Sequence, residues 1–279
     1  MPAGQEHANE KELSAKEWKD IIKKCRNIGI PQITFTGGEP TLRQDLVELI
    51  DSAKWFVTRL NTNGVLLTQE LSKQLYEASL DSVQITLYSN NSEIHNKLVG
   101  ANNFNKTIAG IKNALEAGLN VSVNTPICSM NENYKETVEF INSLGVKYVS
   151  CSGLIQTGNA KKEESKSTGL SQEALFETLK KAKEFCDVNL MEISFTSPGW
   201  ISAEKLKTIG MDIPSCGACL SNMAIAPNGE VMPCQSWLSD KTSLGNILKQ
   251  SWKQIWNSKK CKDIRKNSSK MNEKCPLKD

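Results

Sequence analysis

Strand-like segments alternate with helical patterns along the first two thirds of this 279-residue chain. β-rich runs lie near residues 32–36, 56–60, 82–87, 120–123, 147–151 and 190–195, and helical patterns lie near residues 69–78, 106–117, 134–144 and 172–186. Alternation of this kind, in units of about 25 to 40 residues, is typical of parallel strands joined by crossover helices. The sequence therefore predicts an α/β fold, either doubly wound or a full or partial barrel.

A helix is predicted before the first of these strands. Ser14 and Glu17 have the spacing of a capping box, and apolar side chains recur at helical spacing from Trp18 until Gly29. A second helical pattern, which carries Leu42, Leu46, Leu49 and Ile50, follows the first β-rich run.

The first β-rich run ends in Gly37-Gly38-Glu39-Pro40. Ligands of parallel sheets bind at the carboxyl ends of the strands. Two glycines leave the backbone bare, so a ligand can approach it, and Glu39 can accept hydrogen bonds from an ammonium group. The motif suits an amino-acid-like ligand. A tight turn in which Glu39 and Pro40 only start the next helix is the alternative.

With this motif the sequence resembles the radical S-adenosylmethionine (SAM) superfamily, in which Gly-Gly-Glu-Pro closes the second strand and contacts the methionyl amino group of SAM. The resemblance continues through segments 61–64, 83–89, 94–100 and 104–108, and covers roughly residues 11–195. It implies a partial (β/α)6 barrel of parallel strands that lacks its first strand.

The resemblance also implies a set of SAM-binding residues, with two of them near the ribose (Gln84 and Thr86) and one on the next strand (Asn124). The full set is Gly37, Gly38, Glu39, Pro40, Gln84, Thr86 and Asn124. Polar side chains at strand ends often only satisfy loop backbone, which is the alternative for the last three. His95 is expected to be a structural residue at a helix start.

Five of the nine cysteines crowd the last quarter of the chain. Two residues separate Cys216 from Cys219, and a Pro-Asn-Gly turn ending at Gly229 is predicted to return Cys234 toward Cys219. Together with Cys275, these thiolates suit a soft metal. Their spacing alone does not distinguish structural zinc from iron.

This segment resembles the SPASM or twitch auxiliary domain, in which a cysteine, a hairpin glycine and a second cysteine share the same spacing. The resemblance implies one four-iron, four-sulfur cluster on Cys216, Cys219, Cys234 and Cys275. Cys261 is expected to be a bystander, and Cys25, Cys128, Cys151 and Cys186 are expected to be small core residues. The predicted divisions are a partial barrel at 1–197, a connecting segment at 198–215 and the auxiliary domain at 216–279.

Cleavage of SAM in this superfamily requires three cysteines spaced Cys-x-x-x-Cys-x-x-Cys after the first strand, and the 279 residues contain no such triplet. The chain opens with Met1-Pro2, so its start is expected to fall just past the triplet, through truncation or a misassigned start. A homologue without the catalytic cluster is the alternative. The catalytic four-iron cluster is expected only in an N-terminally complete form.

The resemblance implies an enzyme that, in intact form, removes hydrogen from its substrate through a 5′-deoxyadenosyl radical. The expected substrate is a peptide, a protein or a small molecule, and the expected electron donor is a flavodoxin or ferredoxin. The alternative is a non-catalytic scaffold with a structural metal, which binds a nucleoside-like ligand or a partner.

The composition adds little to this assignment. A formal charge of +3 gives no indication of a nucleic acid or membrane partner. No run approaches the roughly 18 apolar residues of a membrane span, and the N-terminus lacks the apolar core of a signal peptide. A cytoplasmic protein is expected.

Overall fold

The computed structural model describes residues 12–153, 169–237, 242–270 and 275. Neighbouring strands of its main sheet are all parallel and follow the order of the chain, which confirms the predicted α/β class. The six strands are β1 (Gln32–Phe35), β2 (Val57–Thr62), β3 (Ser82–Thr86), β4 (Asn120–Ile127), β5 (Tyr148–Gly153) and β6 (Glu192–Phe195).

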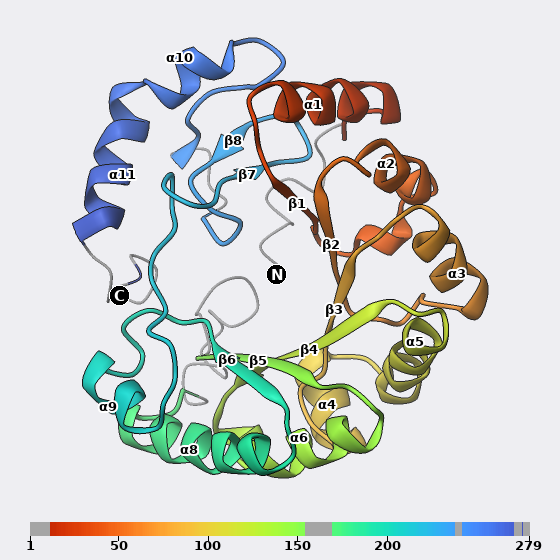
Figure 1. The fold of residues 1–279 in the computed structure, drawn as a ribbon, viewed down its shortest axis with the longest axis vertical. Helices are drawn as coiled ribbons and strands as arrows, with labels where there is room; N and C mark the ends of the chain where they lie inside the picture. Colours follow the sequence, from red (N-terminus) through yellow and green to blue (C-terminus); the bar gives the residue numbers. More distant parts are fainter. Residues whose placement is uncertain (1–11, 154–168, 238–241, 271–274, 276–279) are drawn as a thin grey trace.

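Helices cover the outer side of this curved sheet (Figure 1). They are α2 (Leu46–Ser52), α3 (Gln69–Glu77), α4 (Ser92–Val99), α5 (Phe104–Glu116), α6 (Tyr134–Ser143) and α8 (Gln172–Val188). Every second side chain of a strand faces these helices, and the main core forms there. Val83, Ile85 and Val123 of the strands are fully buried in one cluster with Ile111 and Ile141 of the helices.

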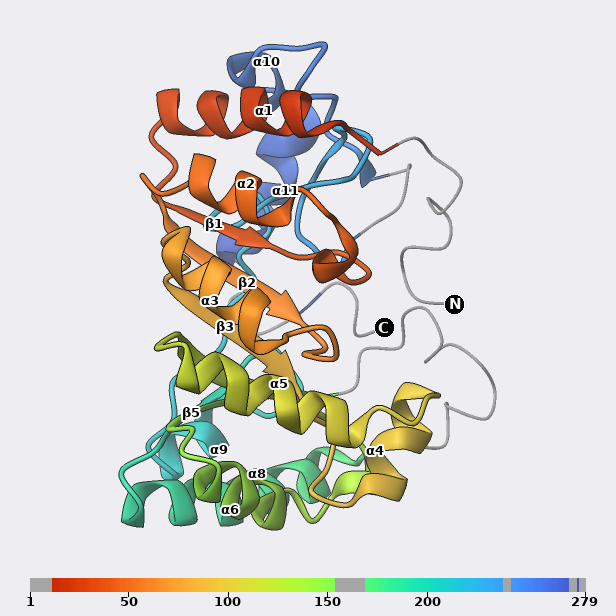
Figure 2. The same cartoon turned by 90° about the vertical axis from the view of Figure 1, so that its right-hand side faces the viewer.

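The inner side of the sheet is polar. Gln84, Thr86 and Asn124 alternate along β3 and β4 with buried apolar residues, and all three are only partly buried. Parallel sheets are usually apolar on both faces because both are covered. A polar inner face therefore suits a ligand. The arrowheads of β1, β2 and β3 point to the same side of the molecule, so their carboxyl ends share one rim (Figure 2).

The first helix, α1 (Ala15–Asn27), packs against the C-terminal part of the chain (Figure 2). That part contains the antiparallel pair β7 (Ala224–Ile225) and β8 (Val231–Met232), followed by α10 (Trp252–Trp256) and α11 (Lys259–Lys270). The amide of Leu13 donates to the Pro227 carbonyl at 2.9 Å. An apolar core joins both ends of the chain and includes Leu13, Ile21, Ile22, Cys25, Val231, Ile247, Ile255 and Cys261.

The local predictions are confirmed with one exception. The capping box of α1 is present, since the Glu17 amide donates to Ser14 Oγ and the Ser14 amide donates to the Glu17 carboxylate. Leu42 was predicted on the apolar face of the next helix, but it is 71% exposed. Pro40 instead starts a 3-10 turn, η1 (Pro40–Leu42), and α2 begins only at Leu46.

Two short helices, α9 (Ala203–Thr208) and α10, have no counterpart among the predicted helices, whereas α4 contains His95, the buried residue predicted at a helix start. The predicted hairpin around Gly229 is present, and the four cysteines expected in the core, Cys25, Cys128, Cys151 and Cys186, are all buried. Among the described strands, β1 pairs only with β2, so its other edge has no strand beside it. None of the described helices has the length and apolarity of a membrane span.

Candidate cofactor and cluster sites

The turn after β1 presents open backbone. An ideal Cβ built on Gly37 or Gly38 would meet no atom within 4 Å. Pro40 is buried and starts η1, so the turn ends at a fixed residue. A ligand can therefore reach the peptide groups of both glycines without displacing a side chain. This is the arrangement that the sequence motif predicts.

Glu39 ties this turn to the end of β2. Its Oε1 accepts hydrogen bonds from the Thr41 amide (3.1 Å) and the Thr62 hydroxyl (2.6 Å), and its Oε2 accepts one from the Asn63 amide (2.8 Å). Glu39 is thus also the side-chain cap of η1, as the alternative interpretation of the motif expects. Because a carboxylate offers about four acceptor sites, Oε2 retains capacity for a ligand donor.

The polar residues predicted on the neighbouring strands are brought together by one residue that the sequence did not single out, Ser150 of β5. Gln84 Nε2 donates to Ser150 Oγ at 3.2 Å, and Ser150 Oγ donates to Asn124 Oδ1 at 3.0 Å. Thr86 is the register partner of Asn124. β3 lies two strands from β1, about 10 Å away, a span that a nucleoside-linked amino acid can cover.

A further residue, Asn61 of β2, belongs to this polar face. It is the register partner of Gln84, and its Oδ1 is buried without a hydrogen-bond donor among the described residues. Buried acceptors are nearly always paired, so this atom suits a donor from a ligand. Its position in Asn-Thr-Asn-Gly at the end of β2 was the available sequence signal.

Cys216, Cys234 and Cys275 lie within electrostatic range of one another. Burial raises the pKa of the Cys234 thiol, and the charges of Cys275 and Cys216 raise it further. The amides of Ser236 and Trp237 donate to the Cys234 sulfur and act in the opposite direction. Amide donors of this kind stabilise thiolates.

Cys219 is fully buried and has a left-handed backbone, with φ of 54°. Burial raises the pKa of its thiol to about 12, and the neighbouring Cys261 thiol contributes next. Non-glycine residues in this conformation concentrate at functional sites. Cys261, predicted to be a bystander, therefore touches a predicted cluster ligand.

Among the parts of the chain that the structure describes, no three His, Cys, Asp or Glu side chains already form a metal-binding group. The predicted cysteines nevertheless share one region, since Cys234 acts electrostatically on Cys219 as well as on Cys216 and Cys275. Four thiols, amide donors and burial suit an iron–sulfur cluster, which is larger than a single ion. The residues fit the group.

Arg265 of α11 fixes the backbone around this site. Its Nε donates to the Cys219 carbonyl (2.9 Å), and its Nη2 donates to the Trp256 carbonyl (2.8 Å) and to the Cys261 sulfur (3.2 Å). The guanidinium also stacks on the Trp256 ring, 3.5 Å from its centroid. One side chain thus joins α10, α11 and the Cys219 turn.

We expect Arg265→Met to lower the free energy of unfolding by about 2–3 kcal/mol, because it leaves two carbonyl groups without a donor. Urea unfolding followed by tryptophan fluorescence measures the loss. Arg265→Lys should restore little of this free energy, because an ammonium group cannot donate to both carbonyl groups as the planar guanidinium does. Arg26→Met is the matched control: Arg26 stacks on the half-exposed Trp55 at 5.3 Å, and its loss should cost at most about 1 kcal/mol. Equal losses for Arg265→Met and Arg26→Met would contradict the role given to Arg265.

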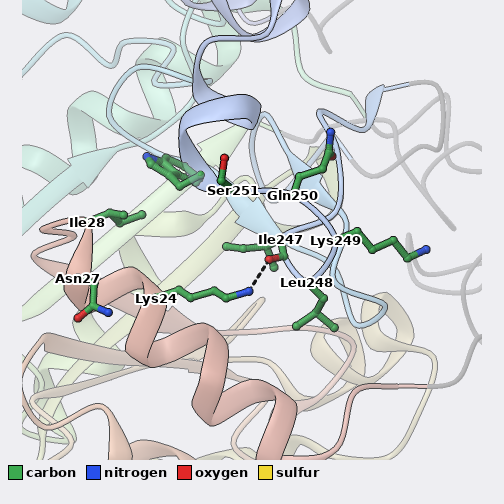
Figure 3. A pocket seen from close by; sticks show the side chains of 9 residues that line it. Lys24, Asn27, Ile28, Ile247, Leu248, Lys249, Gln250 and Ser251 are labelled. Atoms are coloured by element: carbon green, nitrogen blue, oxygen red, sulfur yellow. Dashed lines mark hydrogen bonds between the residues drawn. The ribbon is translucent and has the colours of Figure 1, made fainter.

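A separate hollow lies between the end of α1 and the loop before α10 (Figure 3). Lys24, Asn27 and Ile28 line one side, and Ile247 to Trp252 line the other. Lys24 Nζ donates to the Ile247 carbonyl at 2.8 Å and connects the two sides. Because Ile28 precedes β1, the hollow lies toward the amino ends of the strands. It is distinct from the glycine turn.

Two family models match the chain. Residues 3–144 match the radical SAM superfamily, and residues 216–277 match SPASM, an iron–sulfur cluster-binding domain. The first match spans half of the chain, so the chain belongs to the radical SAM superfamily. SAM and iron–sulfur clusters are the cofactors of these two domains, and the resemblance stated from the sequence is confirmed.

Curated relatives include two enzymes named probable GTP 3′,8-cyclase. That of Methanopyrus kandleri is 36% identical over 152 residues, which are 53% of this chain and 47% of the relative. That of Saccharolobus islandicus is 36% identical over 143 residues, which are 49% of this chain and 46% of the relative. The chain spans about half the length of the curated relatives it matches.

Solved structures with a similar fold cover more of the chain. Native anSMEcpe with bound AdoMet has a TM-score of 0.71 and 18% identity over 92% of this chain and 74% of its own. SuiB of Streptococcus suis has a TM-score of 0.76 and 17% identity over 92% of this chain and 63% of its own. Other structures show anSMEcpe with a Kp18Cys peptide and SuiB with the precursor peptide SuiA. At these identities the similarity concerns the fold.

Proposed function

We propose that this chain supplies the SAM-binding sheet and the auxiliary cluster domain of a radical SAM enzyme that modifies a peptide or protein. The observation that carries the proposal is the open Gly37-Gly38 backbone beside the polar inner face of the sheet. Bound SAM, next to a catalytic cluster, supplies the radical that removes a hydrogen atom from the substrate. The Cys-x-x-x-Cys-x-x-Cys segment that holds this cluster is absent from the 279 residues, so catalysis requires a polypeptide that carries it.

The described residues bind and orient the cofactor in this proposal. The peptide groups of Gly37 and Gly38 and the Oε2 atom of Glu39 take the amino-acid end. Gln84, Thr86 and Asn124 take the ribose side, and Ser150 and Asn61 are added to the predicted set. Pro40 holds the turn. Cys216, Cys219, Cys234 and Cys275 hold the auxiliary cluster.

Two observations favour a peptide over GTP as the substrate. The cyclase relatives match only about half of this chain, whereas the fold shared with anSMEcpe and SuiB covers 92% of it. Triphosphates are usually bound by Arg or Lys. The described inner-face residues near the carboxyl ends of β3, β4 and β5, such as Thr86, Asn124 and Ser152, are uncharged. Calorimetric titration is expected to give no binding of GTP to the chain.

Gly38→Ala tests the SAM site. Gly38 lacks the positive φ that would strain an alanine, so the variant should keep its stability. The new methyl group would occupy the space through which a ligand approaches. We expect SAM affinity, measured by saturation-transfer NMR, to fall at least about tenfold, a loss of about 1.4 kcal/mol.

Gly169→Ala is the control, because its Cβ would also meet open space but lies outside the turn after β1. Unchanged SAM binding in Gly38→Ala, or an equal loss in both variants, would overturn the proposed site. Formation of 5′-deoxyadenosine by the 279-residue chain alone would contradict the need for the three-cysteine segment.

A further inference from the structure

The positive charge of the protein is concentrated on its last two described helices. Between Thr242 and Lys270 the sequence has eight Lys and Arg residues and one acidic residue, Asp263, although the whole chain has a net charge of only +3. The remainder of the chain therefore has a net negative charge. α10 and α11 lie at the outer edge of the molecule, away from the strands of the main sheet (Figure 1).

Four of these lysines form a continuous row on α11, which we name the lysine stripe: Lys259, Lys262, Lys266 and Lys270. Their spacings of three, four and four residues place them on one side of the helix. All four are exposed, and none forms an ion pair within the described residues. The opposite side of α11 carries Cys261 and Ser268, which are buried.

The stripe opposes the stability of its own helix. Like charges at these spacings destabilise a helix. The first turn of α11 carries Lys259 and Lys260 and no acidic residue, although the helix dipole favours acidic residues there. Packing of α11 requires only its inward side. The outward charge therefore points to a binding role.

The inward side of α11 indicates the kind of partner. Ser268 Oγ lies 3.7 Å from the sulfur of Cys216, and Cys261 contacts the thiol of Cys219. A protein docked on the stripe is thus separated from the cysteine site by one helix, about 10 Å thick. We propose that the lysine stripe is the docking surface for a small acidic electron-transfer protein of the flavodoxin type. The choice of partner rests on the proposed auxiliary cluster.

The test compares two quadruple variants of the iron-reconstituted chain. One replaces Lys259, Lys262, Lys266 and Lys270 by Gln. The control replaces four exposed lysines of the barrel helices, Lys97, Lys106, Lys112 and Lys181, by Gln and has the same net charge. Binding of a labelled bacterial flavodoxin is followed by fluorescence anisotropy at about 20 and 200 mM salt. The stripe variant should fold, because neutralisation relieves repulsion along α11.

We expect the stripe variant to bind flavodoxin at least about tenfold more weakly at low salt, with a flatter salt dependence. The control should change less than about twofold. Carbodiimide cross-links between flavodoxin carboxylates and lysines of the wild-type chain should map to the stripe.

Three results would each overturn the inference: equal losses of flavodoxin affinity in both variants, cross-links mainly outside the stripe, or tighter binding of a 20-bp DNA duplex through the same lysines. Iron content, measured on the same samples, separates the two proposals: chains without iron refute the auxiliary cluster, whereas iron-loaded chains that bind flavodoxin independently of the stripe refute only the docking surface.

Discussion

Replacing Cys219 and Cys234 together by alanine is expected to remove about four irons per chain after anaerobic reconstitution with iron and sulfide. Cys219 is buried in a left-handed turn held by Arg265, and Cys234 has two backbone amides directed at its sulfur. Iron and sulfide analysis, together with the charge-transfer absorbance of the cluster, measures the loss.

Two single variants serve as controls for this result. Cys186→Ala removes a fully buried thiol in α8, far along the chain from the cysteine-rich segment, and should keep all of its iron. Cys261→Ala is the stricter control, because Cys261 contacts Cys219 but is not a predicted cluster ligand. It should also keep its iron, and loss of iron would make Cys261 a ligand. Stoichiometric zinc without charge-transfer absorbance would favour the alternative of a scaffold with a structural metal.

Gly110→Ala is expected to lower the free energy of unfolding by about 3 kcal/mol and the melting temperature by about 6–12 °C. A Cβ at Gly110 of α5 would lie 2.1 Å from the Gly64 carbonyl oxygen, so the backbone of one element would have to move. Gly64 itself has φ of +77°, and its own Cβ direction is blocked by Ile85 at 2.8 Å. The loop has little freedom to yield. Thermal unfolding by circular dichroism measures the effect.

The same substitution should weaken SAM binding, because it displaces the loop after β2. Asn63 in this loop donates its amide to Glu39, and its carbonyl accepts from Thr107 of α5. Gly169→Ala, which meets no neighbour within 4 Å, should change stability by less than about 0.5 kcal/mol. A Gly110→Ala variant as stable as the wild type would show that α5 does not need this close contact.

Features that depend on short stretches of sequence were predictable. The capping box at Ser14, the glycine turn after β1 and the hairpin at Gly229 are each specified within a few residues, and the structure contains all three. The alternation of strands and helices gave the fold class for the same reason. Leu42 was misplaced because Pro40 permits either a 3-10 turn or a helix start, and only tertiary packing distinguishes them.

Features that depend on contacts between distant segments were not predictable. Ser150 joins Gln84 to Asn124 through strands whose register no local pattern specifies. Nothing in the sequence around Arg265 and Cys261 indicates that the fold places both of them against Cys219. The packing of α1 on the C-terminal part likewise joins residues from opposite ends of the chain. The assignment of each SAM-binding residue and the division into domains remain predictions.

The core shared by α1 and the C-terminal part has a consequence for synthesis of the protein. The apolar side of α1, with Ile21, Ile22 and Cys25, leaves the ribosome well before its partners Ile255 and Cys261, which follow about 230 residues later in the chain. At roughly 5–20 residues per second, this interval is on the order of tens of seconds. During that time the side of α1 remains exposed to chaperones and to other nascent chains. The core around α1 therefore forms only after the cysteine-rich segment that contributes Cys219 and Cys261 to it has been synthesised.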